Sequence, residues 1–318
     1  MDTESVVQLR DELVTGVEWT RLVNCSVVAT TTIAVLDWIL TFDLEVSLVW
    51  RSRWTVTKFL YFLARYLPFV DCTLALYHQF SYALPASSCQ TLYEVQAWLF
   101  GVGAALVELI FTLRTWAVWG KGRHFTYALL TVFCVMWVGV FVIDHLYLRA
   151  TKHTISPLPQ LIGCVMSVSS SILSVDYILL MLYDACLLSL MVIRGISACE
   201  IRLIHDFLDP LILGRLLLFP VRSEGNSQLI RIVYSDGIIY YAYVWALSLL
   251  NVLVITKLPI ELQTLMMLMA RVVHAVLACR VVLHIREQVR TQQRRALHRH
   301  DSTFGSTSWL IHAEAEMA

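Results

Sequence analysis

The sequence predicts an all-α integral membrane protein, a bundle of seven transmembrane helices with the N-terminus outside and the C-terminus in the cytoplasm. Hydrophobic residues make up 58% of the 318 residues and charged residues 15%, and the mean hydropathy of +0.67 is high for a water-soluble domain. A helix needs about 20 mostly apolar residues to cross the hydrocarbon core of a bilayer. Seven stretches reach that length: 22–49, 57–80, 92–119, 125–147, 172–193, 232–256 and 258–285. Backbone polar groups must be bonded internally in lipid, so we expect each stretch to be helical.

The basic residues between these spans predict the orientation. The loops after the first, third and fifth spans, together with the tail after the seventh and Lys58 at the edge of the second span, hold 15 of the 24 Lys and Arg residues, and the opposite side holds five. Short loops rich in Lys and Arg stay in the cytoplasm. Residues 1–21 then form an extracellular segment, 22–285 the transmembrane domain, and 286–318 a cytoplasmic tail that is basic at first and disordered after Asp301. The acidic N-terminal region shows no signal-peptide pattern, so the first span is expected to be an uncleaved signal anchor.

Two of the eight cysteines stand in predicted outer loops. Cys89 precedes the third span, and Cys164 lies between the fourth and fifth spans. An oxidising compartment would favour a Cys89–Cys164 disulfide. Two unpaired thiols are the alternative, because the sequence does not supply the Cα distance that a disulfide requires. No Cys/His spacing typical of a metal site is present, and we predict no cofactor.

Charged residues in the first two spans suggest an ion pair. Asp43 is eight residues before Arg51, and Arg65 is seven residues after Lys58. At 1.5 Å per residue, both would lie about 11–12 Å from the cytoplasmic side. We therefore predict an Asp43–Arg65 pair that locks the first helical hairpin. A conformational switch at this pair is the alternative.

Further ionisable residues within the spans form a candidate polar pocket, because charges inside a membrane are costly and usually functional. Arg271 needs an anionic partner at similar depth, and Glu108 and Asp184 are the candidates. Interhelical pairing that only fixes the packing is the alternative. The candidate pocket residues are Asp37, Asp71, Glu108, Asp184, Arg271 and His274. Arg114, at the predicted cytoplasmic end of the third span, is a candidate for coupling to a signalling partner, or it snorkels to the lipid headgroups.

The first two spans resemble a family of basidiomycete fungal membrane proteins, the domain of unknown function 6533. The segments DWILTFDLEVSLVW and WTVTKFLYFLARYLP carry the similarity, and LRTWAVWG, DGIIYY and ACRVVLHIRE look similar as well. The matching positions in the first block, residues 22–80, are Asp37, Glu45, Trp50, Lys58, Arg65, Tyr66 and Pro68. The resemblance implies a seven-span, receptor-like topology and no known activity. Residues 197–226 depart from the resemblance, because this stretch is longer and more apolar than we expect between the fifth and sixth spans of the family. A lineage insertion or a gene-model error would produce such a stretch.

These observations favour a receptor-like sensor in the style of G-protein-coupled receptors over an enzyme. Its expected partners are membrane lipids and a cytoplasmic signalling protein such as a G protein, in the plasma membrane or another membrane of the secretory pathway. A transporter, a channel or a membrane scaffold is the alternative, and a zinc-dependent lipid hydrolase is less favoured because the histidines are scattered in depth. A retinal protein needs a lysine where the seventh span has Arg271. No nucleic-acid motif, phosphate-binding loop or nucleophile elbow is present.

Overall fold

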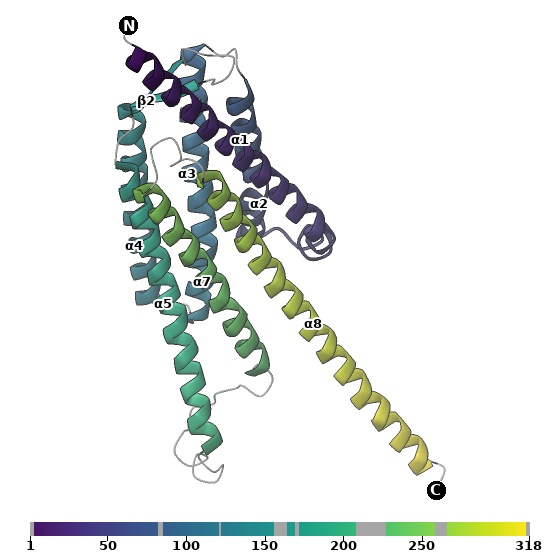
Figure 1. Ribbon diagram of the computed structural model, residues 1–318. Helices are drawn as coiled ribbons and strands as arrows, with labels where there is room; N and C mark the ends of the chain where they lie inside the picture. Colours follow the sequence, from purple (N-terminus) through teal and green to yellow (C-terminus); the bar gives the residue numbers. More distant parts are fainter. Residues whose placement is uncertain are drawn as a thin grey trace.

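A computed structural model describes residues 3–81, 85–120, 122–155, 164–168, 172–207, 227–257 and 266–315. Over these residues the chain forms a helical bundle in which seven helices are long and apolar enough to cross a membrane (Figure 1). The helices are α1 (Thr3–Glu45), α2 (Val56–Phe80), α3 (Ala86–Val118), α4 (Arg123–Ala150), α5 (Ile172–Phe207), α7 (Ser227–Lys257) and α8 (Met267–Ala315). The all-α transmembrane fold class is confirmed, and the two termini lie at opposite ends of the molecule (Figure 1).

The connection between α1 and α2 has a defined local structure. A five-residue π-helical turn, η1 (Val46–Trp50), extends α1 to the turn that follows. Thr55 then caps α2, because its side chain accepts a hydrogen bond from the backbone N–H of Lys58 at 3.2 Å.

A short antiparallel hairpin marks the opposite end of the bundle. Strands β1 (Lys152–Ile155) and β2 (Cys164–Val168) pair between α4 and α5, with Ile155 opposite Cys164. Strand β1 also contacts α3, which begins at this end with Ala86. Apart from this hairpin, the described bundle is helical.

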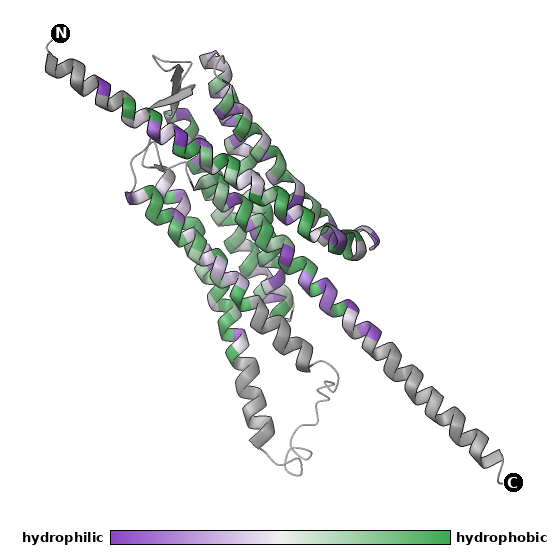
Figure 2. Ribbon diagram, turned by 45° about the vertical axis from the view of Figure 1, so that its right-hand side comes forward, coloured by the Kyte–Doolittle hydropathy of each residue, from purple (hydrophilic) through white to green (hydrophobic). Residues whose placement is uncertain are grey.

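The helices pack around α3 and α8. Helix α3 contacts α2, α4, α5 and α8, and α8 contacts α1, α2, α3 and α7. The main apolar core includes Phe111 of α3, Leu187 of α5 and Ala278 of α8. Large apolar side chains on the outside, such as Ile39 and Leu40 of α1, form the surface expected to face lipid, and hydrophobic residues cover most of the bundle in Figure 2.

Several boundaries differ from those expected from the sequence. The first membrane-compatible helix extends over Val14–Trp50 and the last over Met267–Thr291, while residues 258–265 of the predicted seventh span lie outside the described residues. The disordered tail was not found, because α8 continues as one helix to Ala315. Of the divergent stretch 197–226, residues 197–207 continue α5, and 208–226 lie outside the described residues.

Candidate functional site

One face of α1 presents a polar ladder to the bundle. Asp37, Thr41 and Glu45 are spaced four residues apart, so a helix places them on one face, and all three are buried. The hydroxyl of Thr41 donates to the backbone oxygen of Asp37 at 2.7 Å. Two carboxylates thus enter the interior of an apolar bundle, where they need cationic partners.

Arg65 of α2 supplies the first cation. Its Nη1 lies 2.5 Å from Oδ2 of Asp37, its Nε lies 3.4 Å from Oε2 of Glu45, and its Nη2 bonds the hydroxyl of Thr41. Asp37, Glu45 and Arg65 are all buried. Burying one partner of such a group without the others would be costly, so this contact fixes how α1 and α2 pack.

Arg280 of α8 supplies the second cation. Its Nε lies 2.7 Å from Oδ1 of Asp37. Asp37 therefore joins α1 to both α2 and α8. The Arg280 side chain is 46% exposed and that of Arg65 is 3% exposed, so Arg280 is the more accessible of the two contacts. We call Asp37, Thr41, Glu45, Arg65 and Arg280 the α1–α2–α8 network.

Glu45 is held by two further donors, both aromatic. Its Oε1 accepts hydrogen bonds from Trp50 Nε1 at 3.0 Å and from Tyr66 OH at 2.8 Å. Edge-to-face and stacked contacts join these rings to Phe62, which packs 6.2 Å from Trp50 and 6.1 Å from Tyr66. Glu45 thus has two aromatic hydrogen-bond donors, and Phe62 packs against both of their rings.

The Asp43–Arg65 pair predicted from the sequence is wrong. Asp43 is exposed, and Arg65 pairs with Asp37 and Glu45 instead. The prediction matched the depths of the two residues but not their direction around the helix. At 100° per residue, Asp43 points away from the face that Asp37, Thr41 and Glu45 share.

Two basic side chains bind the backbone of the α1–α2 turn. Nζ of Lys58 donates to the carbonyl oxygens of Trp50 at 3.0 Å and Ser52 at 2.8 Å. Nη1 of Arg286 donates to the carbonyl oxygen of Leu48 at 3.1 Å and to the hydroxyl of Ser52 at 3.0 Å. Cations at the end of a helix satisfy its free carbonyl groups and interact favourably with its dipole. Arg286 also connects α8 to this turn.

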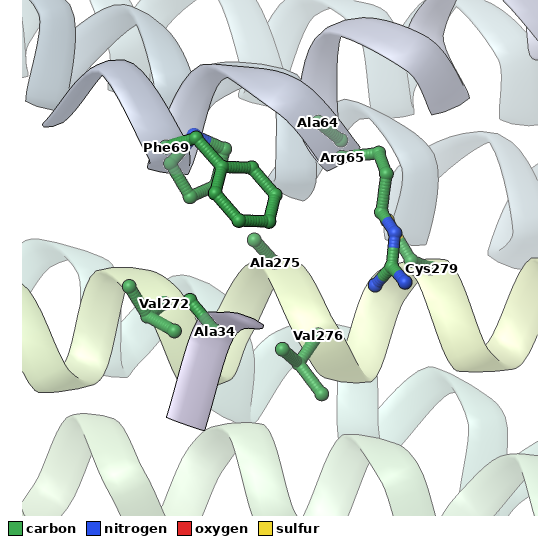
Figure 3. A pocket seen from close by; sticks show the side chains of 9 residues that line it. Ala34, Ala64, Arg65, Phe69, Val272, Ala275, Val276 and Cys279 are labelled. Carbon is green, nitrogen blue, oxygen red and sulfur yellow. The ribbon is translucent and has the colours of Figure 1, made fainter. Parts of the chain in front are cut away.

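A small cavity lies beside the network, between α1, α2 and α8. Its empty space amounts to about 230 Å³ when the open solvent at its mouth is included, so it is a shallow, tight hollow. Figure 3 shows Arg65 reaching from α2 toward Cys279 of α8 at one side of it. The remaining lining is apolar: Ala34, Ala64, Pro68, Phe69, Val272, Ala275 and Val276.

A second ion pair lies deeper along α2 and α8. Nε of Arg271 is 3.4 Å from Oδ2 of Asp71, and both side chains are buried. Neither the nitrogens of Arg271 nor the oxygens of Asp71 have a hydrogen-bond partner in the described part of the chain, and the same holds for Nε2 of the buried His274. Asp71 is thus the partner of Arg271, and the candidates Glu108 and Asp184 form no ion pair with it among the described residues.

Gly103 of α3 makes room for Arg271. A Cβ atom at this position would overlap the guanidinium group, so the arginine packs directly on the α3 backbone. A residue with any side chain would displace it. The sequence alone gave no sign of this contact, because Gly103 is one of several glycines and small residues in the third span.

Glu108, Asp184 and Ser248 form a third polar group, from α3, α5 and α7. The hydroxyl of Ser248 donates to Oδ2 of Asp184 at 2.5 Å, and the carboxyl groups of Glu108 and Asp184 lie within hydrogen-bonding reach of each other. All three side chains are buried. The predicted pocket residues are therefore divided among three separate groups rather than gathered in one pocket.

The end of the bundle next to the hairpin carries a further group that the sequence analysis missed. The hydroxyls of Tyr93 and Tyr147 are 3.1 Å apart, and Tyr177 packs against them in one apolar cluster. Asp144 and Asp176 interact electrostatically with Tyr177. Tyrosines at span ends are common in membrane proteins, so their position in the sequence did not distinguish these residues.

The candidate coupling residue Arg114 lies over the ring of Tyr241 of α7, with its guanidinium carbon 5.7 Å from the ring centroid. The hydroxyl of Tyr241 donates to the backbone oxygen of Phe111 at 2.8 Å. Arg114 therefore connects α3, which carries it, to the Tyr241 ring of α7. Whether it also contacts a signalling partner stays a prediction.

Cys89 is disulfide-bonded. The side chain of Cys164 lies outside the described residues, so the Cys89–Cys164 pairing stays a prediction. Helix α3, which carries Cys89, contacts the hairpin that contains Cys164.

Five other cysteines are free thiols: Cys25, Cys72, Cys134, Cys186 and Cys279. Across the described ranges, no three His, Cys, Asp or Glu side chains gather in a way that could hold a metal ion.

Comparison with known proteins gives one match. Residues 25–70 match the family of unknown function DUF6533. No curated protein matches the chain. The matched segment contains every member of the α1–α2–α8 network except Arg280, and it also contains the aromatic partners of Glu45 and Lys58, which binds the carbonyl groups of the α1–α2 turn. The chain is therefore an integral membrane protein whose ionic network lies almost wholly within a segment similar to this family.

Proposed function

We propose that the protein is a receptor-like membrane sensor in which α8 carries a change in the bundle to the cytoplasmic tail. The bond between Asp37 and Arg280 supports this proposal most directly. It joins α8 to the α1–α2 hairpin through a half-exposed arginine, while the buried Arg65 holds the hairpin itself together. Exposed ion pairs are weak and easily exchanged, whereas buried ones are costly to break. Release of Arg280 would therefore loosen one contact between α8 and the hairpin, while the buried Arg65 and the bonds of Arg286 to the turn stay in place.

The length of α8 fits this role. It runs as one helix from Met267 to Ala315, well beyond the last membrane-compatible residue, Thr291, and Figure 1 shows it projecting from the bundle. A movement at Arg280 would be transmitted along a continuous helix to its basic extension. With the orientation expected from the loop charges, this extension faces anionic lipid and a signalling protein such as a G protein.

Nucleotide-sensitive co-purification tests the proposal. The tagged protein is extracted gently from membranes containing a heterotrimeric G protein, and the bound G protein is measured with and without a non-hydrolysable GTP analogue. We expect binding that the analogue releases. Arg280→Gln should change the amount bound, whereas Arg10→Gln, an exposed arginine near the other terminus, should leave it unchanged. Absence of any association with folded, correctly oriented protein would contradict coupling to a G protein.

Transport of protons or cations is a second candidate, which the buried acidic residues favour. Asp176 and Asp184 lie on α5 eight residues apart, about 12 Å along the helix, and Asp144 and Glu108 interact with them from α4 and α3. Reconstitution into liposomes with an internal pH-sensitive dye distinguishes the two functions. A proton pathway would dissipate an imposed pH gradient, and a sensor would leave it intact.

A further inference from the structure

The carboxyl groups of Glu108 and Asp184 meet in one of the driest parts of the bundle. Glu108 is 1% exposed, Asp184 2% and Ser248 1%. They come from three different helices, α3, α5 and α7, so the fold and not local sequence brings them together. A charge at such a position interacts strongly with its neighbours, because little water screens it.

The oxygen atoms of this group lack sufficient donors when both carboxyls are ionised. Ser248 donates one hydrogen bond, to Oδ2 of Asp184. In the described part of the chain, Oδ1 of Asp184 and both oxygens of Glu108 have no donor, although the two carboxyl groups face each other. Ionised carboxylates only accept hydrogen bonds, whereas a protonated carboxyl also donates one. A single proton between the two groups would therefore turn a repulsive contact into a hydrogen bond.

The neighbouring charged and titratable groups do not supply the positive charge that this proton would bring to the two carboxyls. Among the described residues, Glu108 and Asp184 form no ion pair with a lysine or an arginine, since Arg271 of α8 pairs with Asp71. The titratable groups that interact with the two carboxyls are Tyr183 of α5 and Tyr241 of α7, and Arg114 of α3 is stacked on the ring of Tyr241. His274 of α8 packs against α7 near Val244 and interacts with Arg271. Helix α4 contributes Phe133, which contacts Tyr183.

We propose that Glu108 and Asp184 form a proton-binding site, in which the protonated carboxyl of Glu108 donates to the ionised carboxyl of Asp184. Asp184 then accepts from both Ser248 and Glu108, and one net negative charge stays in the site. Loss of the proton to water leaves two facing carboxylates and destabilises the contact between α3 and α5. This site is independent of the α8 mechanism and of any partner protein.

The pH dependence of stability tests the site. A glutamate in the unfolded chain is ionised above about pH 5, so the folded protein holds one more proton than the unfolded chain. Its stability should therefore fall as pH rises, and the unfolding equilibrium constant should change by about tenfold per pH unit from this one proton. Thermal unfolding in detergent between pH 5 and 8 measures this slope.

Glu108→Gln is the informative variant, because the glutamine amide keeps the hydrogen-bond donor and cannot lose a proton. We expect the stability of the variant to change less with pH than that of the wild type, by the slope of one proton. We also expect the variant to be more stable than the wild type at pH 8. Asp43→Asn removes an exposed carboxylate from α1 and should leave the slope unchanged. His274→Gln tests the buried imidazole of α8, whose burial as a neutral ring acts in the opposite direction, because it would lower stability at acidic pH.

Infrared spectroscopy of the wild type supplies a second measurement that does not require a variant to fold. The site predicts the carbonyl stretch of a protonated carboxyl at neutral pH, which disappears on alkaline titration. An unchanged pH slope in Glu108→Gln would overturn the proposal, as would the absence of this band. A wild-type stability that rises with sodium at constant pH and ionic strength, and not in Glu108→Gln, would show that a metal cation occupies the site instead of a proton.

Discussion

Arg65 and Arg271 are both buried arginines in the same bundle, but their surroundings differ. Arg65 contacts two carboxylates and a hydroxyl from one face of α1. Among the described residues Arg271 forms one ion pair, at 3.4 Å with Asp71, and its guanidinium group lies on the bare backbone of Gly103. Equal burial therefore does not mean equal stabilisation.

The difference follows from helix geometry. Acceptors spaced four residues apart form a row along α1, and a guanidinium group can bond several of them at once. Around Arg271, α3 offers a glycine and no acceptor, and so the desolvation of the charge is only partly offset. We expect the α1–α2–α8 network to stabilise the fold strongly and the Asp71–Arg271 pair to contribute little.

Arg65→Ala should have the largest effect on stability. In the described part of the chain, it leaves Asp37 with the half-exposed Arg280 as its one cation and leaves Glu45 buried without a cation. Removing one partner from a buried ionic group costs about 3–5 kcal/mol, so thermal unfolding in detergent should occur well below the wild-type temperature. Arg149→Ala removes an exposed arginine from the end of α4 and is the control. An unchanged unfolding temperature for Arg65→Ala would remove the basis of the comparison.

Gly103→Ala should have the next largest effect, because the new Cβ overlaps the guanidinium group of Arg271. Overpacking of this kind costs about 1–3 kcal/mol. The cost should shrink when Arg271→Met is also present, since the flexible methionine can give way. Equal costs of Gly103→Ala in the two backgrounds, measured by thermal unfolding, would mean that Arg271 does not pack on α3.

The paired replacement Asp71→Asn with Arg271→Met should have the smallest effect. Removing both members of a poorly bonded buried pair is often neutral or stabilising by about 1–4 kcal/mol. The same treatment of the network, Asp37→Asn with Arg65→Met, should remain destabilising, because Glu45 and Arg280 lose their partners. If the two double variants lose the same stability, then the pairs are equivalent and the contrast between them is wrong.

Much of the fold could be predicted from apolar run lengths alone. Seven stretches of sufficient length gave the seven helices, since a bilayer sets a length that every span must meet. The ends were less predictable. Helix α8 continues to Ala315 through a polar sequence, and its composition suggested disorder instead.

The partners in the candidate sites were harder to predict. Arg65 was correctly identified as buried, but its partner was chosen by depth and not by direction around the helix, and so Asp43 was chosen in place of Asp37 and Glu45. Contacts between helices distant in sequence, such as Asp37 with Arg280 or Glu108 with Asp184, depend on how the helices rotate and pack. A single sequence contains no direct signal for that rotation.

The most direct test of the account compares Asp37→Asn with Asp43→Asn. The two variants remove the same charge from the same helix, six residues apart, and change the side-chain volume equally little. Because Asp37 bonds both Arg65 and Arg280 while Asp43 is exposed, we expect Asp37→Asn to lower the unfolding temperature in detergent clearly. Asp43→Asn should stay within about 0.5 kcal/mol of the wild type. Equal effects, or a larger effect of Asp43→Asn, would contradict Asp37 as the residue that joins α1, α2 and α8.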